Sequence, residues 1–188
     1  MRKLFLTFMM LALLAPVLAQ PTVLITYYSR TGNTRGMAEA VALGASQVEG
    51  VQVVLKTVEE TTTEDLLGAE AIIVGSPVYN ANVAPAVQAF ISSWPFEGAL
   101  LKDKLGAAFV TAGGISAGEE LSQMNILHSM LIFGMIVVGG PDWTAPFGAS
   151  AIVGEAPFDQ TEGLAPQFVQ KGQALGQRVA ELALRLNR

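Results

Sequence analysis

The 188-residue chain has the length of one domain, and hydrophobic residues make up 51% of it against 14% charged residues, so a large core is available. Its formal net charge of −5 argues against nucleic acid as a partner. The absence of cysteine excludes thiol catalysis, disulfides, thiolate-bound zinc and iron–sulfur clusters.

The first 19 residues have the pattern of a secretory signal peptide: two basic residues, an apolar run over Leu4–Ala15 and small residues up to Ala19. The alternative is an uncleaved membrane anchor, but the run is shorter than the ~18–20 residues that a span needs. Cleavage after Ala19 would remove two positive charges and take the net charge from −5 to −7. We therefore expect residues 1–19 to be a signal peptide, residues 20–188 to be the domain, and the protein to be exported, either periplasmic or secreted.

Beyond this leader, short apolar runs rich in β-branched residues alternate with helical patterns. In chain order, the predicted elements are a strand at Thr22–Tyr28, a helix at Thr34–Gln47, a strand at Val51–Thr57, a short helix at Thr61–Leu67, a strand at Ala71–Gly75, a helix at Pro85–Ser93, a strand at Lys104–Thr111, a helix at Glu119–Phe133, a strand at Ile136–Gly139 and a helix at Gly163–Asn187. This alternation predicts an α/β fold, namely a three-layer α/β/α sandwich around a five-stranded parallel sheet.

The segment Pro141–Gly163 does not fit the alternation. It is rich in glycine, proline and aromatic residues, among them Trp143, Phe147 and Phe158, and it is too long for an idle connection. We predict a packed irregular segment that contributes to a site or to a subunit interface.

A hydroxyl-rich turn separates the first predicted strand from the first predicted helix. It consists of Ser29, Arg30, Thr31, Gly32, Asn33 and Thr34. Three hydroxyl groups and the free N–H groups of a helix N-terminus converge there, so both hydrogen bonding and the helix dipole favour an anion. The plain alternative is a well-capped helix start that binds nothing.

Two further loops leave the carboxyl ends of predicted strands, where open α/β sheets bind their ligands. The loop after the third strand contains Pro77, Val78, Tyr79 and Asn80, and the loop after the fourth contains Thr111, Ala112, Gly113, Gly114, Ile115 and Ser116. A proline-stiffened turn can follow a planar ring, and a tyrosine can stack on it. Glycines let backbone amides approach the opposite ring edge. Each loop alone could be an ordinary connection, but together they predict a site for a planar cofactor that carries a phosphate.

The three loops resemble those of the flavodoxin-like FMN proteins, and the closest likeness is to the WrbA-type NAD(P)H:quinone oxidoreductases. The likeness extends over about residues 22–187. It includes the segments Tyr27-Tyr28-Ser29, Gly75-Ser76-Pro77 and Pro146-Phe147-Gly148-Ala149-Ser150. It implies a flavodoxin-like sandwich with FMN as the cofactor.

The resemblance also implies a role for each loop. Ser29–Thr34 would bind the FMN phosphate, Pro77–Asn80 would contact the isoalloxazine and the ribityl chain, and Thr111–Ser116 would contact the pyrimidine edge. No side chain is assigned as a catalytic acid or base, and no metal ligands occur at useful spacing.

The sequence departs from the WrbA pattern at four places, one of which is the third loop, where the family has more glycine and serine. Val78-Tyr79-Asn80-Ala81-Asn82 stands where the family has Thr-Arg-Phe-Gly-Asn, and Phe133-Gly134-Met135 stands where it has His-Gly-Met. The excursion after the second strand, associated with tetramers in the family, is short here. These departures concern quinone specificity, nicotinamide use and tetramer formation, whereas the phosphate loop is intact.

The resemblance implies an exported FMN-dependent oxidoreductase that transfers electrons from NAD(P)H or another donor to a quinone or another small acceptor. A membrane quinone pool or a redox partner could exchange electrons with it, and we expect a homo-oligomer. Two other hypotheses are a flavodoxin-type one-electron carrier and a flavodoxin-like binding domain without FMN.

Three single residues are open to more than one interpretation. His128, the only histidine, is interpreted as a surface or packing residue of a helix. Trp94 and Phe96 follow the third predicted helix and either pack in the core or an interface, or face the flavin ring.

Overall fold

The computed structural model describes residues 20–159 and 163–187. The predicted signal peptide lies outside the described residues. None of the helices in the described part of the chain is both long enough and apolar enough to cross a membrane.

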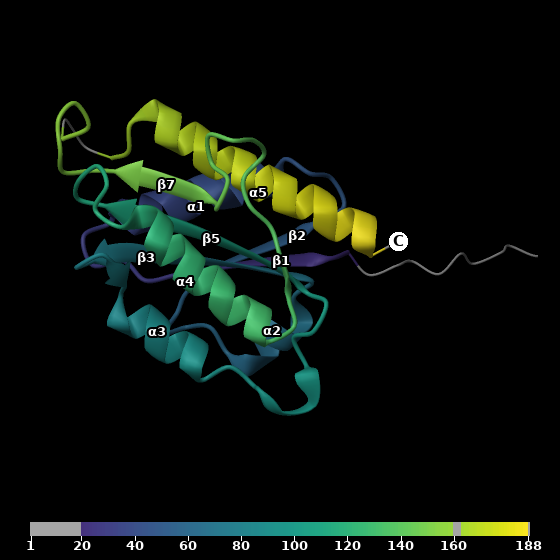
Figure 1. Ribbon diagram of the computed structural model, residues 1–188. Helices are drawn as coiled ribbons and strands as arrows, with labels where there is room; N and C mark the ends of the chain where they lie inside the picture. The colour runs from purple at the N-terminus through teal and green to yellow at the C-terminus, as the bar shows by residue number, and fades with distance from the viewer. Residues whose placement is uncertain (1–19, 160–162, 188) are drawn as a thin grey trace, which may run out of the picture.

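A parallel sheet in the order β2-β1-β3-β5-β6 forms the middle layer (Figure 1). Its strands are β1 (Thr22–Tyr27), β2 (Gln52–Thr57), β3 (Ala71–Tyr79), β5 (Leu105–Ala112) and β6 (Ile136–Val137), with β4 (Asn82–Val83) on β3 and β7 (Ala149–Ile152) on β5. The α/β class and the parallel sheet are as predicted.

The prediction of five strands was wrong, because the sheet has seven. The short strand β4 pairs antiparallel with the end of β3, so the second predicted loop is a hairpin. The outer position beside β5 is shared by β6, which pairs at Leu105, and by β7, which pairs from Phe109 onward. Strand β7 lies inside Pro141–Gly163, which we predicted to be irregular. Its four residues, Ala-Ser-Ala-Ile, are too few and too small to show a strand pattern.

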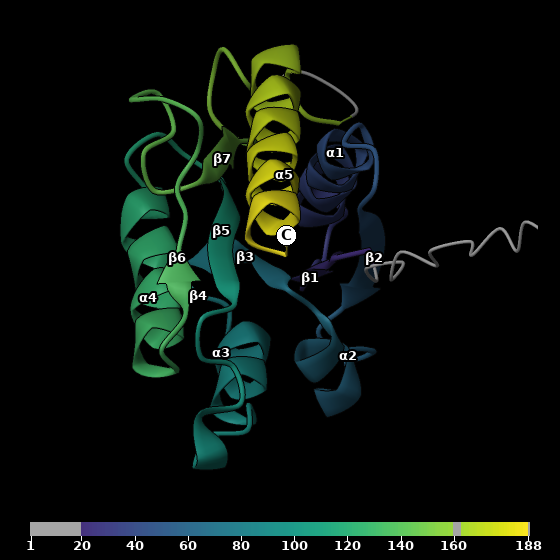
Figure 2. The ribbon, with the colours of Figure 1, turned by 90° about the vertical axis from the view of Figure 1, so that its right-hand side faces the viewer.

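Helices cover both faces of the sheet, as Figure 2 shows, and this confirms the three predicted layers. The helices are α1 (Asn33–Ser46), α2 (Thr63–Gly68), α3 (Pro85–Ser92), α4 (Glu119–Ile132) and α5 (Pro166–Leu186), with a short 3₁₀ turn η1 (Glu97–Ala99). Helix α5 begins at Pro166 rather than at Gly163, because proline is favoured at the first helical position.

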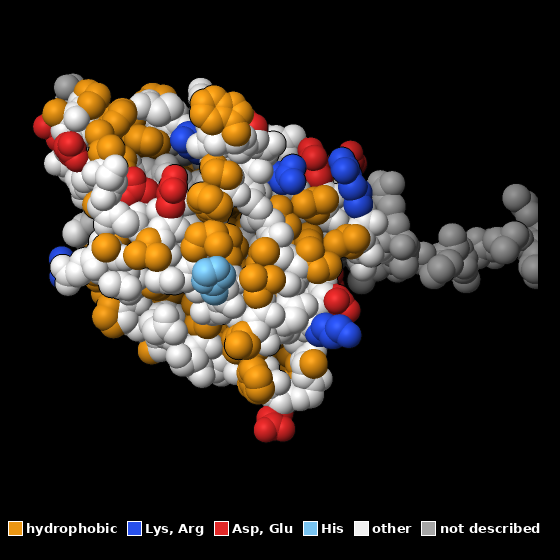
Figure 3. Space-filling model, viewed as in Figure 1, with side chains coloured by type: hydrophobic (Ala, Val, Ile, Leu, Met, Phe, Trp, Pro, Cys, Tyr) orange, Lys and Arg blue, Asp and Glu red, His pale blue; other side chains and the backbone are white. Residues whose placement is uncertain are grey.

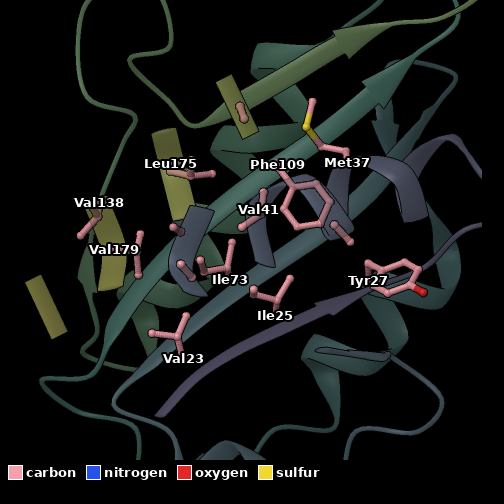
Figure 4. Packing of buried hydrophobic residues seen from close by; sticks show 14 of the residues in the cluster. Val23, Ile25, Tyr27, Met37, Val41, Ile73, Phe109, Val138, Leu175 and Val179 are labelled. Atoms are coloured by element: carbon pink, nitrogen blue, oxygen red, sulfur yellow. The ribbon is translucent and has the colours of Figure 1, made fainter. Parts of the chain in front are cut away.

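The core consists of two clusters, one on each side of the sheet. Between the sheet and helices α1 and α5, Figure 4 shows Ile25 and Ile73 facing Val41, Leu175 and neighbouring side chains. The opposite cluster joins alternate strand residues to α2, α3 and α4. Strand β3 is covered on both faces, because Ala71–Val74 is fully buried.

Helices α1 and α5 approach so closely that glycine is required between them. A Cβ atom at Gly44 would lie 1.9 Å from the carbonyl oxygen of Gln173, and one at Gly176 would lie 1.9 Å from that of Val41. These contacts are to backbone atoms, which cannot rotate away. The two helices therefore form a tight pair that positions the start of α1 over the sheet.

We predict that Gly176→Ala lowers the free energy of unfolding by about 2 kcal/mol or more, because the methyl group must push α5 away from α1. Urea unfolding followed by circular dichroism measures this change. Gly68→Ala is the matched control, since a Cβ there meets nothing within 4 Å, and alanine in a helix should keep or raise the stability. Equal midpoints for the two variants would contradict the proposed tight contact.

Candidate functional site

Three loops meet at the carboxyl edge of the sheet and enclose a pocket of about 230 Å³. In Figure 1 this edge lies at the end toward which β7 points, away from the C-terminus. The pocket is lined by Arg30, Thr31, Asn33, Thr34, Pro77, Val78, Tyr79, Thr111, Ala112, Gly113 and Val153. Most of the predicted site residues thus come together, whereas Ser29, Gly32, Asn80, Gly114, Ile115 and Ser116 do not line this pocket.

The first loop is held open by Ser29, whose Oγ accepts hydrogen bonds from the backbone N–H groups of Gly32 and Arg35, both at 3.2 Å. Gly32 precedes α1 with φ = 94°, a left-handed conformation that favours glycine. The N–H groups of Asn33 and Thr34 find no acceptor among the described residues. Two donors at the positive end of a 14-residue helix therefore point to an anion such as a phosphate.

The hydroxyl of Thr34 has a partner within the protein. Its Oγ1 lies 2.8 Å from Oγ1 of Thr111, and both side chains are buried. Sequence analysis placed this hydroxyl among the phosphate ligands, but the structure uses it to join the start of α1 to the end of β5.

The second loop is a rigid hairpin. The Ser76 hydroxyl donates to the carbonyl oxygen of Pro77 at 2.8 Å and accepts from the N–H of Ala84 at 2.9 Å. Tyr79 pairs with Asn82 across the two strands. The hairpin therefore presents the tyrosine ring from a fixed backbone.

A second pocket of about 690 Å³ also borders this tyrosine. It is lined by Arg30, Val78, Tyr79, Asn80, Asn82, Val83 and Pro85. Asn80, which we predicted at the flavin, lines this pocket and not the first.

The outer half of the third loop is bound by carboxylates. Glu155 Oε2 accepts a hydrogen bond from the N–H of Ile115 at 2.6 Å, and Glu119 Oε1 accepts one from the N–H of Ser116 at 3.0 Å. We expected these amides to face the pyrimidine edge of a flavin, and in the structure they face carboxylates instead.

Sequence reasoning missed Val153 and Glu155. Both follow β7, and the rule that ligands bind beyond the carboxyl ends of strands would have pointed to them. Because β7 was not predicted, sequence analysis could not place these two residues at the carboxyl edge of the sheet.

The ionisable side chains near the first loop have different partners and different burial. Arg35 forms an ion pair with Glu39 at 2.8 Å, and this hydrogen bond raises the pKa of Arg35. Burial raises the pKa of Tyr27 at the end of β1. Arg30 forms no ion pair within the described chain; its Cζ lies 5.4 Å from the centroid of the Tyr79 ring, at cation–π distance.

The other aromatic residues lie away from both pockets. Trp94 is buried and packs on Phe90 and Phe133, with ring centroids 5.7 and 5.4 Å apart, so it is a core residue. Phe96 is 65% exposed and contacts only the Phe133 ring among the described aromatic residues. His128 is exposed on α4, and Figure 3 shows hydrophobic side chains around the histidine.

Comparison with known proteins places the chain among flavin-linked families. The family model for NADPH-dependent FMN reductases matches residues 22–150. A protein named flavodoxin from Aquifex aeolicus is 35% identical over 170 residues, covering 85% of each chain. An NAD(P)H dehydrogenase (quinone) from Azorhizobium caulinodans is 35% identical over 164 residues, covering 74% of this chain and 81% of that protein.

The solved structures show the same fold. The flavodoxin, WrbA-like protein from Agrobacterium tumefaciens superposes with a TM-score of 0.72 at 22% identity. The match covers 88% of this chain and 98% of that one.

We predict that Thr34→Val lowers the free energy of unfolding by about 1–3 kcal/mol, because it leaves the buried Thr111 hydroxyl without its partner. Thr34→Val/Thr111→Val should cost clearly less than the sum of the two single changes. Urea unfolding of all four proteins gives the coupling energy. Additive costs would contradict a hydrogen bond between the two hydroxyls.

Proposed function

This chain is a member of the NADPH-dependent FMN reductase family, and we propose that it transfers electrons from NAD(P)H to a quinone through FMN bound at the three-loop pocket. It is a flavodoxin-like enzyme of the WrbA type, and FMN is its cofactor. The observation that carries the proposal is that two unpartnered N–H groups at the start of α1 belong to residues that line the first pocket. The second and third loops line the same pocket and form the slot in it.

The residues present fit FMN. The N–H groups of Asn33 and Thr34 and the hydroxyl of Thr31 would hold the phosphate. Pro77–Tyr79 and Thr111–Gly113 line the two sides of the slot that would take the ribityl chain and the ring. The expected phosphate role of Thr34 thus passes from its hydroxyl to its backbone amide.

Bound FMN supplies the redox chemistry, by taking a hydride from a reduced donor and passing electrons to an acceptor. The protein would bind FMN and the reactants and orient them. Pro77 is buried and Val78 half-buried, so they keep water from one side of the slot. The Arg30 guanidinium and the Tyr79 ring stand where this slot meets the second pocket.

A one-electron carrier is the second candidate, because a relative with 35% identity is named flavodoxin. The two functions differ in whether NAD(P)H reduces the bound flavin directly. An enzyme is reduced by it and turns over with a quinone, whereas a carrier needs dithionite or a protein reductase. Anaerobic titration with NADH, NADPH and dithionite, followed by flavin absorbance, separates the two.

Export is a further part of the proposal, and it is supported by the pattern of residues 1–19. An exported enzyme could exchange electrons with a membrane quinone pool or with a redox partner. Expression in a bacterial host, followed by fractionation and N-terminal sequencing, tests it. Cleavage after Ala19 is the expected result, and an intact N-terminus in the cytoplasmic fraction would contradict it.

We predict that the purified chain binds FMN with micromolar or tighter affinity and turns yellow. A colourless protein without micromolar affinity for FMN would contradict the proposed function. Absorbance and quenching of flavin fluorescence measure the binding.

We predict that Gly32→Ala weakens FMN about 5–30-fold, since a side chain at φ = 94° costs roughly 1–2 kcal/mol. Riboflavin lacks the phosphate, so its affinity should be unchanged. Gly50→Ala is the matched control, because Gly50 also has a positive φ (86°) but lies before β2 at the opposite edge. Equal losses of FMN and riboflavin would show that the first loop does not hold the phosphate.

We predict that Glu155→Gln raises the midpoint potential of bound FMN by on the order of 20 mV, because a negative charge beside the pyrimidine edge opposes reduction. Glutamine can still accept the Ile115 N–H. Spectroelectrochemistry measures the shift, and Glu97→Gln, on the exposed turn η1, is the control. An unchanged potential would place the outer half of the third loop away from the ring.

A further inference from the structure

The second pocket adjoins the proposed FMN site and shares three residues with it. Arg30, Val78 and Tyr79 line both pockets. A ligand in the second pocket would therefore lie next to FMN in the first, separated from it by the Arg30–Tyr79 pair. An electron donor or acceptor has to bind next to FMN in order to react with it, and the second pocket offers that position.

The charge of the second pocket selects an anion. Of the described residues that line the two pockets, Arg30 alone is charged. Its neighbour Arg35 is already paired with Glu39, whereas Arg30 has no carboxylate partner within the described residues. The positive charge of Arg30 is therefore available to a ligand.

Arg30 is held toward this pocket. Its Cζ lies 5.4 Å from the centroid of the Tyr79 ring, and a guanidinium over an aromatic face keeps its N–H donors at the rim. Tyr79 belongs to a hairpin whose tip residues Asn80 and Ala81 have φ of 51° and 62°. A Cβ at Gly118 would lie 2.6 Å from Cα of Ala81, so the tip packs on the start of α4.

Two amide side chains add polar groups next to this charge. Asn80 and Asn82 both line the pocket, and Asn82 Nδ2 donates to the carbonyl oxygen of Asn80 at 3.1 Å. Amide groups bind phosphate oxygens and sugar hydroxyls. A quinone is uncharged, so it gains less from the Arg30 guanidinium than a phosphate does.

The opposite edge of the site repels an anion. The carboxylates of Glu155 and Glu119 lie on the N–H groups of Ile115 and Ser116, and neither forms a salt bridge within the described chain. An anionic reactant is therefore attracted to the Arg30 side and disfavoured at the third loop.

We infer that the second pocket binds the phosphate-bearing part of the nucleotide donor, with the Arg30 guanidinium as the group that recognises its charge. This inference rests on the proposed function. It assigns Arg30 to the donor and not to the FMN phosphate, which the N–H groups of α1 bind.

The test compares Arg30→Gln and Arg30→Lys with the wild-type full chain. ADP-ribose, which carries the phosphates of NADH but no nicotinamide ring, is the probe for binding to the FMN-loaded protein by calorimetry. We expect Arg30→Gln to weaken ADP-ribose at least 10-fold and Arg30→Lys to weaken it less, because lysine keeps the charge but not the planar fork. Arg35→Gln is the matched control and should change binding less than twofold.

Two kinetic and binding arms separate the donor from the cofactor. Arg30→Gln should raise KM for NADPH by a larger factor than it raises KM for an uncharged dihydronicotinamide, because only NADPH carries phosphates for the guanidinium to bind. The ratio of FMN to riboflavin affinity should also stay the same. A fall in this ratio with unchanged ADP-ribose binding would overturn the inference, because Arg30 would then bind the FMN phosphate.

A failure of the proposed function can be told apart from a failure of this inference. If the wild-type chain does not bind FMN, ADP-ribose binding is measured on the FMN-free protein. Arg30-dependent binding there would still support the pocket, and binding that does not depend on Arg30 would overturn it.

Discussion

The parallel pairing of β1, β3 and β5 is the constraint on which the rest of the structure depends. Tyr27 lies beside Gly75, and Gly75 lies beside Phe109, so the three strands end at the same edge. This register requires glycine in the middle strand, because a Cβ at Gly75 would lie 2.0 Å from the Phe109 ring. Three loops far apart in sequence thereby reach one pocket, and the tight pairing of α1 with α5 places a helix N-terminus beside them.

The site that results has two electrostatic sides. Free N–H groups at the start of α1 and the Arg30 guanidinium form a positive side, where phosphates are favoured. Glu155 and Glu119 form a negative side along the third loop. An anionic group is therefore favoured on the first side and disfavoured on the second.

Much of the site could be predicted because local patterns carry it. Hydroxyls and glycine before a helix, and a proline after a buried strand, are visible in any one stretch of chain. The role of Thr34 could not be predicted, because its partner Thr111 is 77 residues away and only packing brings the hydroxyls together. Strand β7 could not be predicted either, since four small residues form a strand only when the edge of β5 is there to pair with them.

The sequence by itself determined the alternation of strands and helices, the three loops and the polar turn before α1, because each depends on residues that are neighbours in the chain. The tertiary structure alone decided which donors stay free and which are used. Glu155 engages the Ile115 amide, and Tyr79 orients Arg30 between two pockets, through contacts between segments that no local pattern records. A hydrogen bond or a ring contact forms with whichever suitable group lies close in space. The fold decides which groups lie close to one another.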